Sequence, residues 1–233
     1  MFCVVPMRDE TLTGSHLFSR EDRHAVIAAG GVEEAPDRTA LHLGRVDLVL
    51  AADGGFRLLP ALGLSCDVLV GDFDTLTEVE VEKARSAGVR VRQFPSNKAQ
   101  SDLEIAIEEA HRAGATRVTL VGALGGAWDH CVANLLSPLS LCADHGMWAR
   151  LLTAQSQIYL ARGRVRIQAP GQRVSLAALS EVVEELTLRG MEYPLEKARL
   201  SRSQTLGLAN RALDPSAFLD FTSGELLITV LHS

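Results

Sequence analysis

The chain has 233 residues, a hydrophobic fraction of 47% and a formal net charge of -6. This length allows one large domain or two of unequal size, and the apolar fraction suffices for a packed core. The negative charge and the lack of a Lys/Arg cluster argue against a general affinity for nucleic acid or anionic membranes, so small ligands are the expected partners.

Cysteine usage and the N-terminal composition favour a cytoplasmic protein. The four cysteines show no Cys-x-x-Cys spacing, so we expect reduced, mostly buried thiols instead of a zinc ribbon or a disulfide framework. No stretch approaches the roughly 20 apolar residues that span a bilayer, and residues 1–23 carry charges where a signal peptide is apolar. We interpret residues 1–23 as a leader or an edge extension. The cysteines are Cys3, Cys66, Cys131 and Cys142.

From residue 25 onward, buried strands alternate with helices, which is typical of a Rossmann-like domain with a parallel sheet. The helix at 101–113 has the strongest local signal, because Ser101 and Glu104 form a capping box and an apolar stripe follows. We predict strands at 25–29, 47–52, 67–71, 89–94, 118–121 and 149–153, and helices at 56–62, 79–87, 101–113 and from about 128 onward.

After about residue 150 the pattern changes to short strand-like runs separated by Gly and Pro, which favours an antiparallel β-sandwich. The runs are 157–160, 164–168, 173–177, 184–188, 206–208 and 225–231. We therefore predict an α/β fold class in which the leader is followed by an N-terminal Rossmann-like domain at 24–150 and a C-terminal antiparallel β-sandwich domain at 151–233.

Two carboxylates directly follow the predicted strand at 67–71. Asp72 and Asp74 stand at spacing i, i+2, which in an extended backbone directs both side chains to the same side. At the carboxyl end of a parallel strand, such a pair is suited to hold Mg²⁺ with a phosphate. A polar turn that caps the next helix is the alternative interpretation of this segment taken alone.

Three further acids, Asp53, Asp102 and Asp129, each follow a strand or open the next helix. Carboxylates gathered at one edge repel one another unless a cation neutralises them, so we expect Mg²⁺ and a polyphosphate there. Asp102 also has a structural explanation, because the helix dipole stabilises a carboxylate in the first turn. A Mg²⁺-nucleotide enzyme, a sugar-nucleotide or other phosphate-binding protein, and a non-catalytic module all stay open at this point.

A glycine-rich turn at 122–126 precedes the helix that begins near residue 128. Glycines let backbone N–H groups approach an anion, and the helix N-terminus adds a favourable potential. Neither a Walker-type motif nor Gly-x-Gly-x-x-Gly occurs in the sequence. This argues against a P-loop NTPase and against a simple dinucleotide dehydrogenase.

Four motifs, in order and spacing, resemble those of the thiamine pyrophosphokinase family. They are Asp53-Gly54-Gly55, Gly71-Asp72-Phe73-Asp74-Thr75, Lys98-x-x-Ser101-Asp102 and Gly122-Ala123-Leu124-Gly125-Gly126-x-x-Asp129-His130, with Asn134 one turn later. The C-terminal part resembles the family's thiamine-binding domain in Leu188-x-Gly190-x-x-Tyr193-Pro194-Leu195 and Asn210. The resemblance covers about residues 25–231.

The resemblance implies Mg²⁺-dependent transfer of pyrophosphate from ATP to the hydroxyl of thiamine, which gives thiamine diphosphate and AMP. It implies that 24–150 binds ATP and that 151–233 binds thiamine, in a homodimer whose subunits share the thiamine site. The implied catalytic residues are Asp72, Asp74, Asp102 and Asp129, the first three as metal ligands. The implied nucleotide-binding residues are Asp53, Gly54, Gly55, Lys98, Ser101, Gly125, Gly126 and His130, and the implied thiamine-binding residues are Tyr193 and Asn210.

Two departures from the family pattern leave the acceptor open. Ala127 stands where the family commonly has Arg, which removes a planar, charged donor near the phosphates. Ala209 stands where a Ser usually precedes Asn210, and Arg211 is a partial substitute for that hydrogen-bond donor. The alternatives are a related pyrophosphokinase that acts on another alcohol, such as a hydroxymethylpterin, and a non-catalytic nucleotide- or thiamine diphosphate-binding protein.

Overall fold

The computed structural model describes residues 10–12, 22–31, 43–215 and 217–231. The chain divides into two compact units, Phe18–Ala154 and Gln155–Ser233, the second of which also includes Met1–Leu17. We call them the α/β unit and the sandwich unit. Their division lies close to the boundary predicted near residue 150, and the predicted fold class is confirmed.

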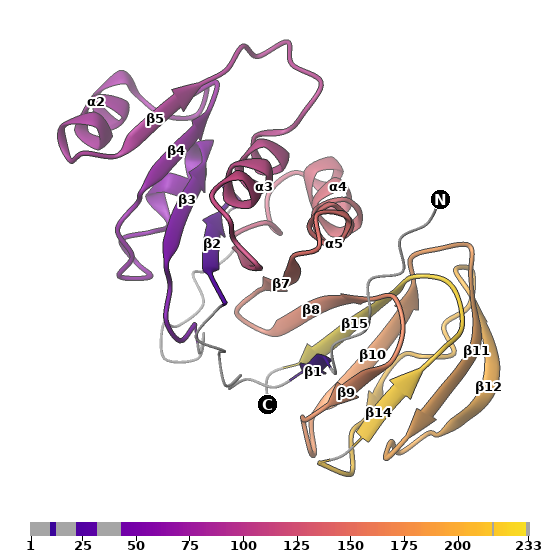
Figure 1. Ribbon diagram of the computed structural model, residues 1–233. Helices are drawn as coiled ribbons and strands as arrows, with labels where there is room; N and C mark the ends of the chain where they lie inside the picture. Colours follow the sequence, from indigo (N-terminus) through magenta and orange to yellow (C-terminus); the bar gives the residue numbers. More distant parts are fainter. Residues whose placement is uncertain (1–9, 13–21, 32–42, 216, 232–233) are drawn as a thin grey trace. The chain divides into compact units, whose positions relative to one another are not determined.

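The α/β unit is built on a parallel sheet in the strand order β7-β6-β2-β3-β4-β5 (Figure 1). The direction of winding reverses at β2, between β3 and β6, and ligands of such sheets bind at the carboxyl ends of the strands near this point. The strands are β2 (His24–Ala28), β3 (Leu48–Ala52), β4 (Val68–Gly71), β5 (Arg90–Gln93), β6 (Arg117–Val121) and β7 (Trp148–Leu152). The helices are η1 (Asp53–Arg57), α2 (Glu78–Ser86), α3 (Asp102–Arg112), α4 (Trp128–Leu136) and α5 (Pro138–Asp144).

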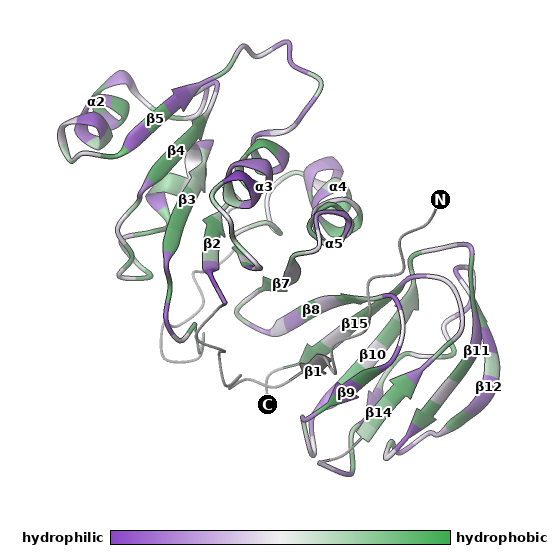
Figure 2. Ribbon diagram, in the orientation of Figure 1, coloured by the Kyte–Doolittle hydropathy of each residue, from purple (hydrophilic) through white to green (hydrophobic). Residues whose placement is uncertain are grey.

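Both faces of this sheet are covered. Helix α3 lies across β2, β3 and β4 on one face (Figure 1). On the other face, Leu59 and Leu62 from the turns after η1 and Val81 and Ala84 of α2 pack against the strands. Strands that are buried on both faces have continuous apolar sequences, so they could be predicted from the sequence. For the same reason, β3 and β4 are green in Figure 2.

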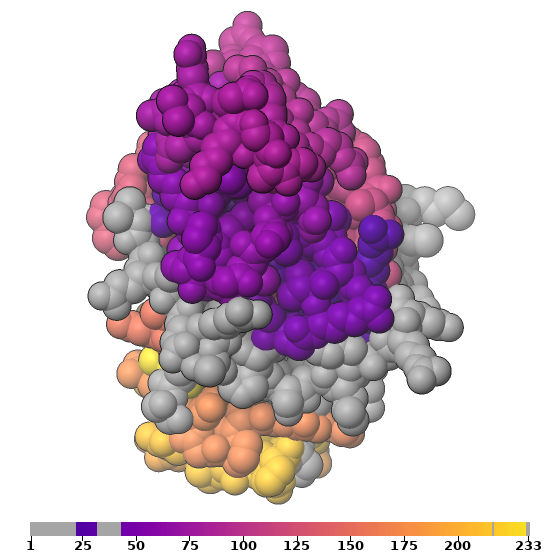
Figure 3. Space-filling view, turned by 90° about the vertical axis from the view of Figure 1, so that its left-hand side faces the viewer, coloured from indigo at the N-terminus to yellow at the C-terminus, as the bar shows by residue number. Residues whose placement is uncertain are grey.

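Strand β5 forms one edge of the sheet. This edge faces the viewer in Figure 3. Its sequence Arg90-Val91-Arg92-Gln93 is largely exposed, and charged side chains on an edge strand discourage pairing with another chain. Helix α2 packs beside this strand. Its N-terminus is fixed by a capping box in which Thr77 and Glu80 bond each other's backbone N–H groups.

The helix predicted at 56–62 is wrong. The chain instead enters the 3₁₀ helix η1 at Asp53 and continues in turns up to Gly63. Pro60 has no N–H to donate inside an α-helix, and Gly55 lies so close to β2 that an added Cβ would stand 2.1 Å from the Ala28 carbonyl oxygen. The helix predicted from about 128 is two helices, because Pro138 starts α5 immediately after α4 ends.

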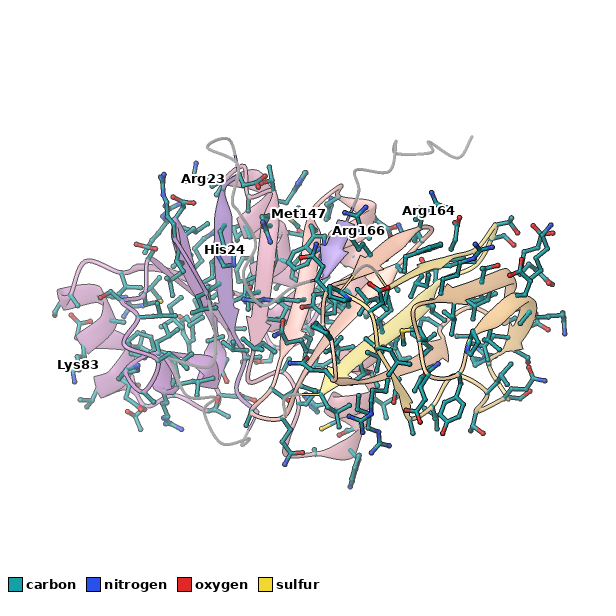
Figure 4. All side chains as sticks on the ribbon, turned by 90° about the horizontal axis from the view of Figure 1, so that it is seen from below. Arg23, His24, Lys83, Met147, Arg164 and Arg166 are labelled. Atoms are coloured by element: carbon teal, nitrogen blue, oxygen red, sulfur yellow. The ribbon has the colours of Figure 1, made fainter. Side chains whose placement is uncertain are left out.

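A buried polar network lies at the start of β2, where Figure 4 labels His24. One ring nitrogen of His24 is 2.9 Å from the Thr119 hydroxyl, and the other is 3.1 Å from the Arg45 carbonyl oxygen. The Arg150 guanidinium donates to the same hydroxyl. The pKa of His24 is lowered to about 4, chiefly by burial and also by the nearby cationic side chains of Arg150 and Arg117, so the imidazole is neutral at pH 7.

The sandwich unit contains two groups of paired strands, β1-β9-β14-β11-β12 and β13-β10-β15-β8. All pairs are antiparallel except β1 with β9. In β9, Val165 and Ile167 are buried, whereas Arg166 and the residue just before the strand, Arg164, both labelled in Figure 4, are exposed. The strands are β1 (Glu10–Leu12), β8 (Ser156–Ala161), β9 (Val165–Ile167), β10 (Arg173–Ala178), β11 (Val182–Arg189), β12 (Leu195–Ser201), β13 (Asn210–Arg211), β14 (Ala217–Asp220) and β15 (Leu226–Leu231).

In the C-terminal part, one predicted strand is wrong and two strands were not predicted. The strand predicted at 206–208 is a turn, in which Gly207 packs so close to Leu176 that an added Cβ would meet the Leu176 Cβ at 2.6 Å. Strand β12 was not predicted, because only Leu200 of its residues is fully buried and its charged side chains hide the alternation of an edge strand. Strand β14 was not predicted either.

Of residues 1–23, only 10–12, 22 and 23 are described, and β1 lies at the edge of its sheet. The cysteines in the described part of the chain, Cys66, Cys131 and Cys142, are free thiols, and Cys3 lies outside it. Burial raises the pKa of both Cys66 and Cys142 to about 12. None of the helices in the described residues combines the length and the apolar composition needed to cross a bilayer.

Candidate active site

Asp53 stands directly after β3, in an environment that disfavours its charge. The residue is buried, and its Oδ1 atom has no hydrogen-bond partner among the described residues. The pKa of Asp53 is raised to about 6, chiefly by burial and also by the nearby charges of Asp74, Asp102 and Asp72, against an opposing hydrogen bond from Gly54. A buried, unpartnered carboxylate oxygen of this kind is stabilised by a bound cation.

Asp72 and Asp74 follow β4, but their side chains converge by a turn and not by extended backbone. Phe73 between them has a φ of +64°, in the left-handed region that non-glycine residues rarely adopt. The Asp74 N–H points to Asp72 Oδ1 at 3.4 Å. The extended geometry predicted for this pair is therefore wrong. Both Phe73 and Asp53, whose φ is +42°, hold strained backbone at the site, as residues at functional sites often do.

The three carboxylates of Asp53, Asp72 and Asp74 form one group, which we call the carboxylate triad. One oxygen from each lies within 4.8 Å of the others, and the triad is the only such set of three or more potential metal ligands in the part of the chain that the structure describes. Hard oxygen ligands of this kind suit Mg²⁺. The unpartnered Asp53 oxygen and the raised Asp53 pKa both fit a divalent cation here.

The electrostatics of Asp72 differ from those of Asp53. Burial disfavours its charge, but hydrogen bonds from the Ser96 hydroxyl and the Asp74 N–H, together with the Lys98 ammonium, outweigh burial and lower the pKa of Asp72. The triad therefore combines one acid that is ionised well below neutral pH with one that resists ionisation. A cation would favour the charged form of both.

Asp102 lies beside the triad but outside it, although the family resemblance implies a metal-ligand role for it together with Asp72 and Asp74. The Lys98 ammonium is 3.0 Å from the Asp102 carboxylate and 4.0 Å from that of Asp72. Burial raises the pKa of Asp102 despite this lysine. The predicted capping box of α3 is confirmed: the Ser101 hydroxyl accepts from the Glu104 N–H, and the Glu104 carboxylate accepts from the Ser101 N–H.

The glycines of the motifs allow close backbone approach. Gly55 is fixed against β2 as described above, and an added Cβ at Gly54 would stand 3.2 Å from the Thr75 hydroxyl. In the turn after β6, Gly125 and Gly126 have φ values of +109° and +80°. The Gly125 N–H points to the Cys131 sulfur at 3.2 Å, and the Asn134 amide donates to the Ala123 carbonyl oxygen at 2.8 Å. Residues of α4 thus hold the glycine turn in place.

Asp129 and His130 open α4 on its exposed side. Among the described contacts, the Asp129 carboxylate accepts a hydrogen bond from the His130 N–H, and neither residue joins the triad. Ala127, where the family commonly has Arg, is the N-cap of α4 and makes no side-chain capping bond. A negative group near this helix start would meet the positive end of the helix dipole.

The predicted thiamine-binding residues lie together in the sandwich unit. Tyr193 is 60% exposed, whereas Asn210 is only 4% exposed. The Asn210 amide bonds the Tyr193 backbone in both directions, at 3.0 Å and 2.8 Å. Arg211 donates to the Gly171 carbonyl oxygen at 2.6 Å and lies 3.6 Å from the Glu192 carboxylate. Its guanidinium is therefore engaged within the unit.

Sequence reasoning missed two residues that support the acidic loop after β4. Arg57 donates to the Thr75 carbonyl oxygen at 2.9 Å and pairs with Glu80 of α2. Ser96 bonds the Asp72 carboxylate. Both partners of Arg57 stand 18 or more residues away in the sequence, so no local pattern could have indicated these two contacts. For Arg57, its position two residues after the Asp53-Gly54-Gly55 motif was the one available signal.

Comparisons with known proteins agree with the motifs. Residues 39–148 match the family model described as thiamin pyrophosphokinase, catalytic domain. A thiamine pyrophosphokinase from Bacillus subtilis (strain 168) is 26% identical over 206 residues, which cover 87% of this chain and 95% of that protein.

Solved structures give the same result for the fold. The crystal structure of thiamine pyrophosphokinase from Bacillus subtilis has a TM-score of 0.80 at 25% identity, covering 91% of this chain and all of that one. The enzyme from Geobacillus thermodenitrificans has a TM-score of 0.77 at 27% identity, covering 90% and 98%. Yeast thiamin pyrophosphokinase, at 15% identity and a TM-score of 0.78 over 99% of this chain and 93% of that one, shares the fold. The family model and the relatives of 25% identity or more indicate thiamine pyrophosphokinase, the kinase-type diphosphotransferase family that the motifs resemble.

Proposed function

We propose that this chain transfers the pyrophosphoryl group of ATP to the hydroxyl of thiamine in the presence of Mg²⁺. The hydroxyl oxygen attacks the β-phosphorus, and the bond from that phosphorus to the AMP oxygen breaks. AMP leaves with the bonding electron pair, and the hydroxyl proton is released. The observation that carries the proposal is the carboxylate triad of Asp53, Asp72 and Asp74, whose oxygens lie within 4.8 Å of one another.

In this proposal the triad holds Mg²⁺, with Asp102 beside it. When bound, the ion neutralises negative charge on the phosphate oxygens. Lys98 is the cationic side chain paired with these acids in the described residues, with its ammonium 3.0 Å from Asp102 and 4.0 Å from Asp72. It can offset phosphate charge once the nucleotide is present, because its flexible stem allows the ammonium to move between carboxylate and phosphate.

The backbone supplies the remaining contacts to the nucleotide. Gly54, Gly55, Gly125 and Gly126 keep side chains out of the way of the phosphates. Asp129 and His130 stand at the start of α4, where they are proposed to contact nucleotide or acceptor. Positioning of this kind accounts for most of the catalysis of phosphoryl transfer, since the reaction needs little covalent help from the protein.

Thiamine is cationic and aromatic, so we propose that it stacks on the exposed ring of Tyr193, as the resemblance implies. Its 60% exposure leaves the ring available to a ligand. We also propose that the chain works in the cytoplasm as a homodimer whose subunits share the thiamine site. A measurement of mass in solution by light scattering tests the dimer, and a monomer that retains full activity would contradict it.

The activity is tested by incubating the purified chain with ATP, Mg²⁺ and one alcohol at a time, and by measuring AMP and the diphosphorylated product. AMP formed with thiamine supports the proposal. AMP formed only with a hydroxymethylpterin assigns another acceptor. This acceptor is tested because Ala127 and Ala209 depart from the family pattern. Binding of ATP or thiamine diphosphate without AMP release would assign a non-catalytic role and refute the transfer reaction.

A further inference from the structure

The buried amide of Asn210 makes an unusual contact with the segment that carries Tyr193. Its Oδ1 accepts from the Tyr193 N–H at 3.0 Å, and its Nδ2 donates to the Tyr193 carbonyl oxygen at 2.8 Å. These are the two hydrogen bonds that a peptide group of a neighbouring strand would make. The primary amide of a side chain thus replaces a backbone partner.

The contact extends a short backbone ladder. Met191 bridges Ala212 in antiparallel fashion, and the Glu192 N–H donates to the Arg211 carbonyl oxygen at 2.9 Å. The Asn210 side chain adds the next rung, at Tyr193. Asn210 itself is anchored by β13, where it pairs with the buried Val174 of β10. Tyr193 is therefore tied to the core of the sandwich unit through Asn210.

The hydrogen-bonding capacity of the amide decides what else Asn210 can do. Its Oδ1 also accepts from the Arg211 N–H at 2.8 Å, so both lone pairs of that oxygen are used. Only one N–H of Nδ2 is left, on a side chain that is 4% exposed. The amide is thus directed at the protein backbone. The ring of Tyr193, in contrast, is 60% exposed.

We propose that Asn210 is a positioning residue that acts through Tyr193: its amide fixes the Tyr193 backbone and so holds the exposed ring in the orientation that receives the acceptor. This inference rests on the proposed function, because it takes Tyr193 as the ring on which thiamine stacks. The alternative is direct contact between Asn210 and thiamine. The two roles predict different results when both residues are changed.

A double-mutant cycle on Asn210→Ala and Tyr193→Ala separates the two roles. Stacking on an exposed ring corresponds to a change of about two- to fivefold in affinity, so we expect Asn210→Ala to raise the KM for thiamine by about that factor with kcat little changed. In the Tyr193→Ala background the same substitution leaves KM unchanged within about 1.5-fold. An equal factor in both backgrounds would show that Asn210 acts on thiamine directly, and would overturn the proposal.

Hydrogen exchange of the Tyr193 amide provides a readout that does not depend on activity. We expect exchange in Asn210→Ala to be at least about tenfold faster than in the unmodified chain, because the N–H loses its acceptor. Unchanged exchange overturns the proposal. If the unmodified chain forms no AMP with thiamine, the proposed function fails, while this measurement still decides whether Asn210 holds Tyr193.

Two further variants control for loss of structure. Asn210→Asp keeps an oxygen that can accept from the Tyr193 N–H and replaces the Nδ2 donor to the Tyr193 carbonyl by a second oxygen, so it serves for the same cycle if Asn210→Ala does not fold. Ser180→Ala is the matched control in the same unit, because the Ser180 hydroxyl bonds the Val182 carbonyl oxygen and the Glu225 N–H. It should lower stability without changing the KM for thiamine or the exchange of the Tyr193 amide. An equal rise of KM in Ser180→Ala would attribute the effect of Asn210→Ala to general destabilisation and overturn the proposal.

Discussion

Replacing Asp53 by Asn tests the electrostatics of the carboxylate triad. The change removes the charge and keeps the shape, and Asn tolerates the positive φ of +42° at this position. The pKa of Asp53 is raised from 3.8 to about 6, chiefly by burial and then by the like charges of Asp74, Asp102 and Asp72. The ionised carboxylate at this position therefore lowers the stability of the folded protein.

The magnitude follows from linkage. A pKa that is higher in the folded than in the unfolded protein gives a stabilising contribution that is present below pH 3.8 and is lost as the pH rises through about 6. The shift corresponds to roughly 3 kcal/mol at about 1.4 kcal/mol per pKa unit, and solvent screening reduces it to about 1–2 kcal/mol. At pH 8 without Mg²⁺, Asp53→Asn should raise the free energy of unfolding by that amount. Near pH 4 the two proteins should be nearly equal.

Added Mg²⁺ should make the unmodified chain more stable than Asp53→Asn at pH 8. A cation that binds only the folded state at 100 times its Kd stabilises it by about 2.7 kcal/mol. We expect this gain in the unmodified chain and a much smaller one in Asp53→Asn, because a triad ligand is missing.

The assay is urea unfolding at pH 8 and at pH 4, with and without Mg²⁺. Glu78→Gln, at an exposed acid in the first turn of α2, is the matched control and should change stability by less than about 0.5 kcal/mol. The reasoning would be refuted if Asp53→Asn were less stable than the unmodified chain at pH 8 without Mg²⁺. Equal stabilisation of both proteins by Mg²⁺ would also refute it.

Three further predictions concern activity and stability. Asp72→Asn and Asp74→Asn should each reduce AMP formation at least about 100-fold with the circular dichroism spectrum retained, because each removes a ligand of the proposed Mg²⁺ site; unchanged activity would exclude that residue from the site. His24 has its pKa lowered to about 4, so stability should fall by up to about 3 kcal/mol as the pH drops from 6.5 to 4, opposite in sign to the Asp53 effect. Urea unfolding of His24→Gln should lack that part of the pH dependence, and an identical profile would contradict it. Ala209 has a φ of +57°, a left-handed backbone conformation that glycine adopts without strain. Ala209→Gly should therefore raise the free energy of unfolding by up to about 1 kcal/mol. A loss of stability would show that the backbone strain is relieved elsewhere.

The sequence was sufficient where local chemistry decides the structure. Capping residues Ser101 and Glu104 identified the start of α3, because their side chains satisfy N–H groups of their own helix turn. Continuous apolar runs identified the central strands, because those strands are buried on both faces. The same signals failed for β12, whose exposed edge position leaves only Leu200 fully buried.

The detailed geometry of the carboxylate triad and its neighbours could not be predicted from local sequence. The sequence placed Asp53, Asp72 and Asp74 near the ends of strands, and the parallel sheet brings those ends to one edge. It could not show that Phe73 would adopt a left-handed backbone or that Lys98 would pair with Asp102, since both depend on contacts formed after the strands pack.

The sequence by itself thus determined the strands of the parallel sheet, the capped helix α3 and the family motifs, because hydrophobic period, capping residues and spacing are properties of neighbouring residues. Only the tertiary structure decided which acids share a site and that the amide of Asn210 is engaged by Tyr193. The physical reason is that pKa values, desolvation and hydrogen-bond saturation arise from groups that are distant in the chain and meet only in the folded protein.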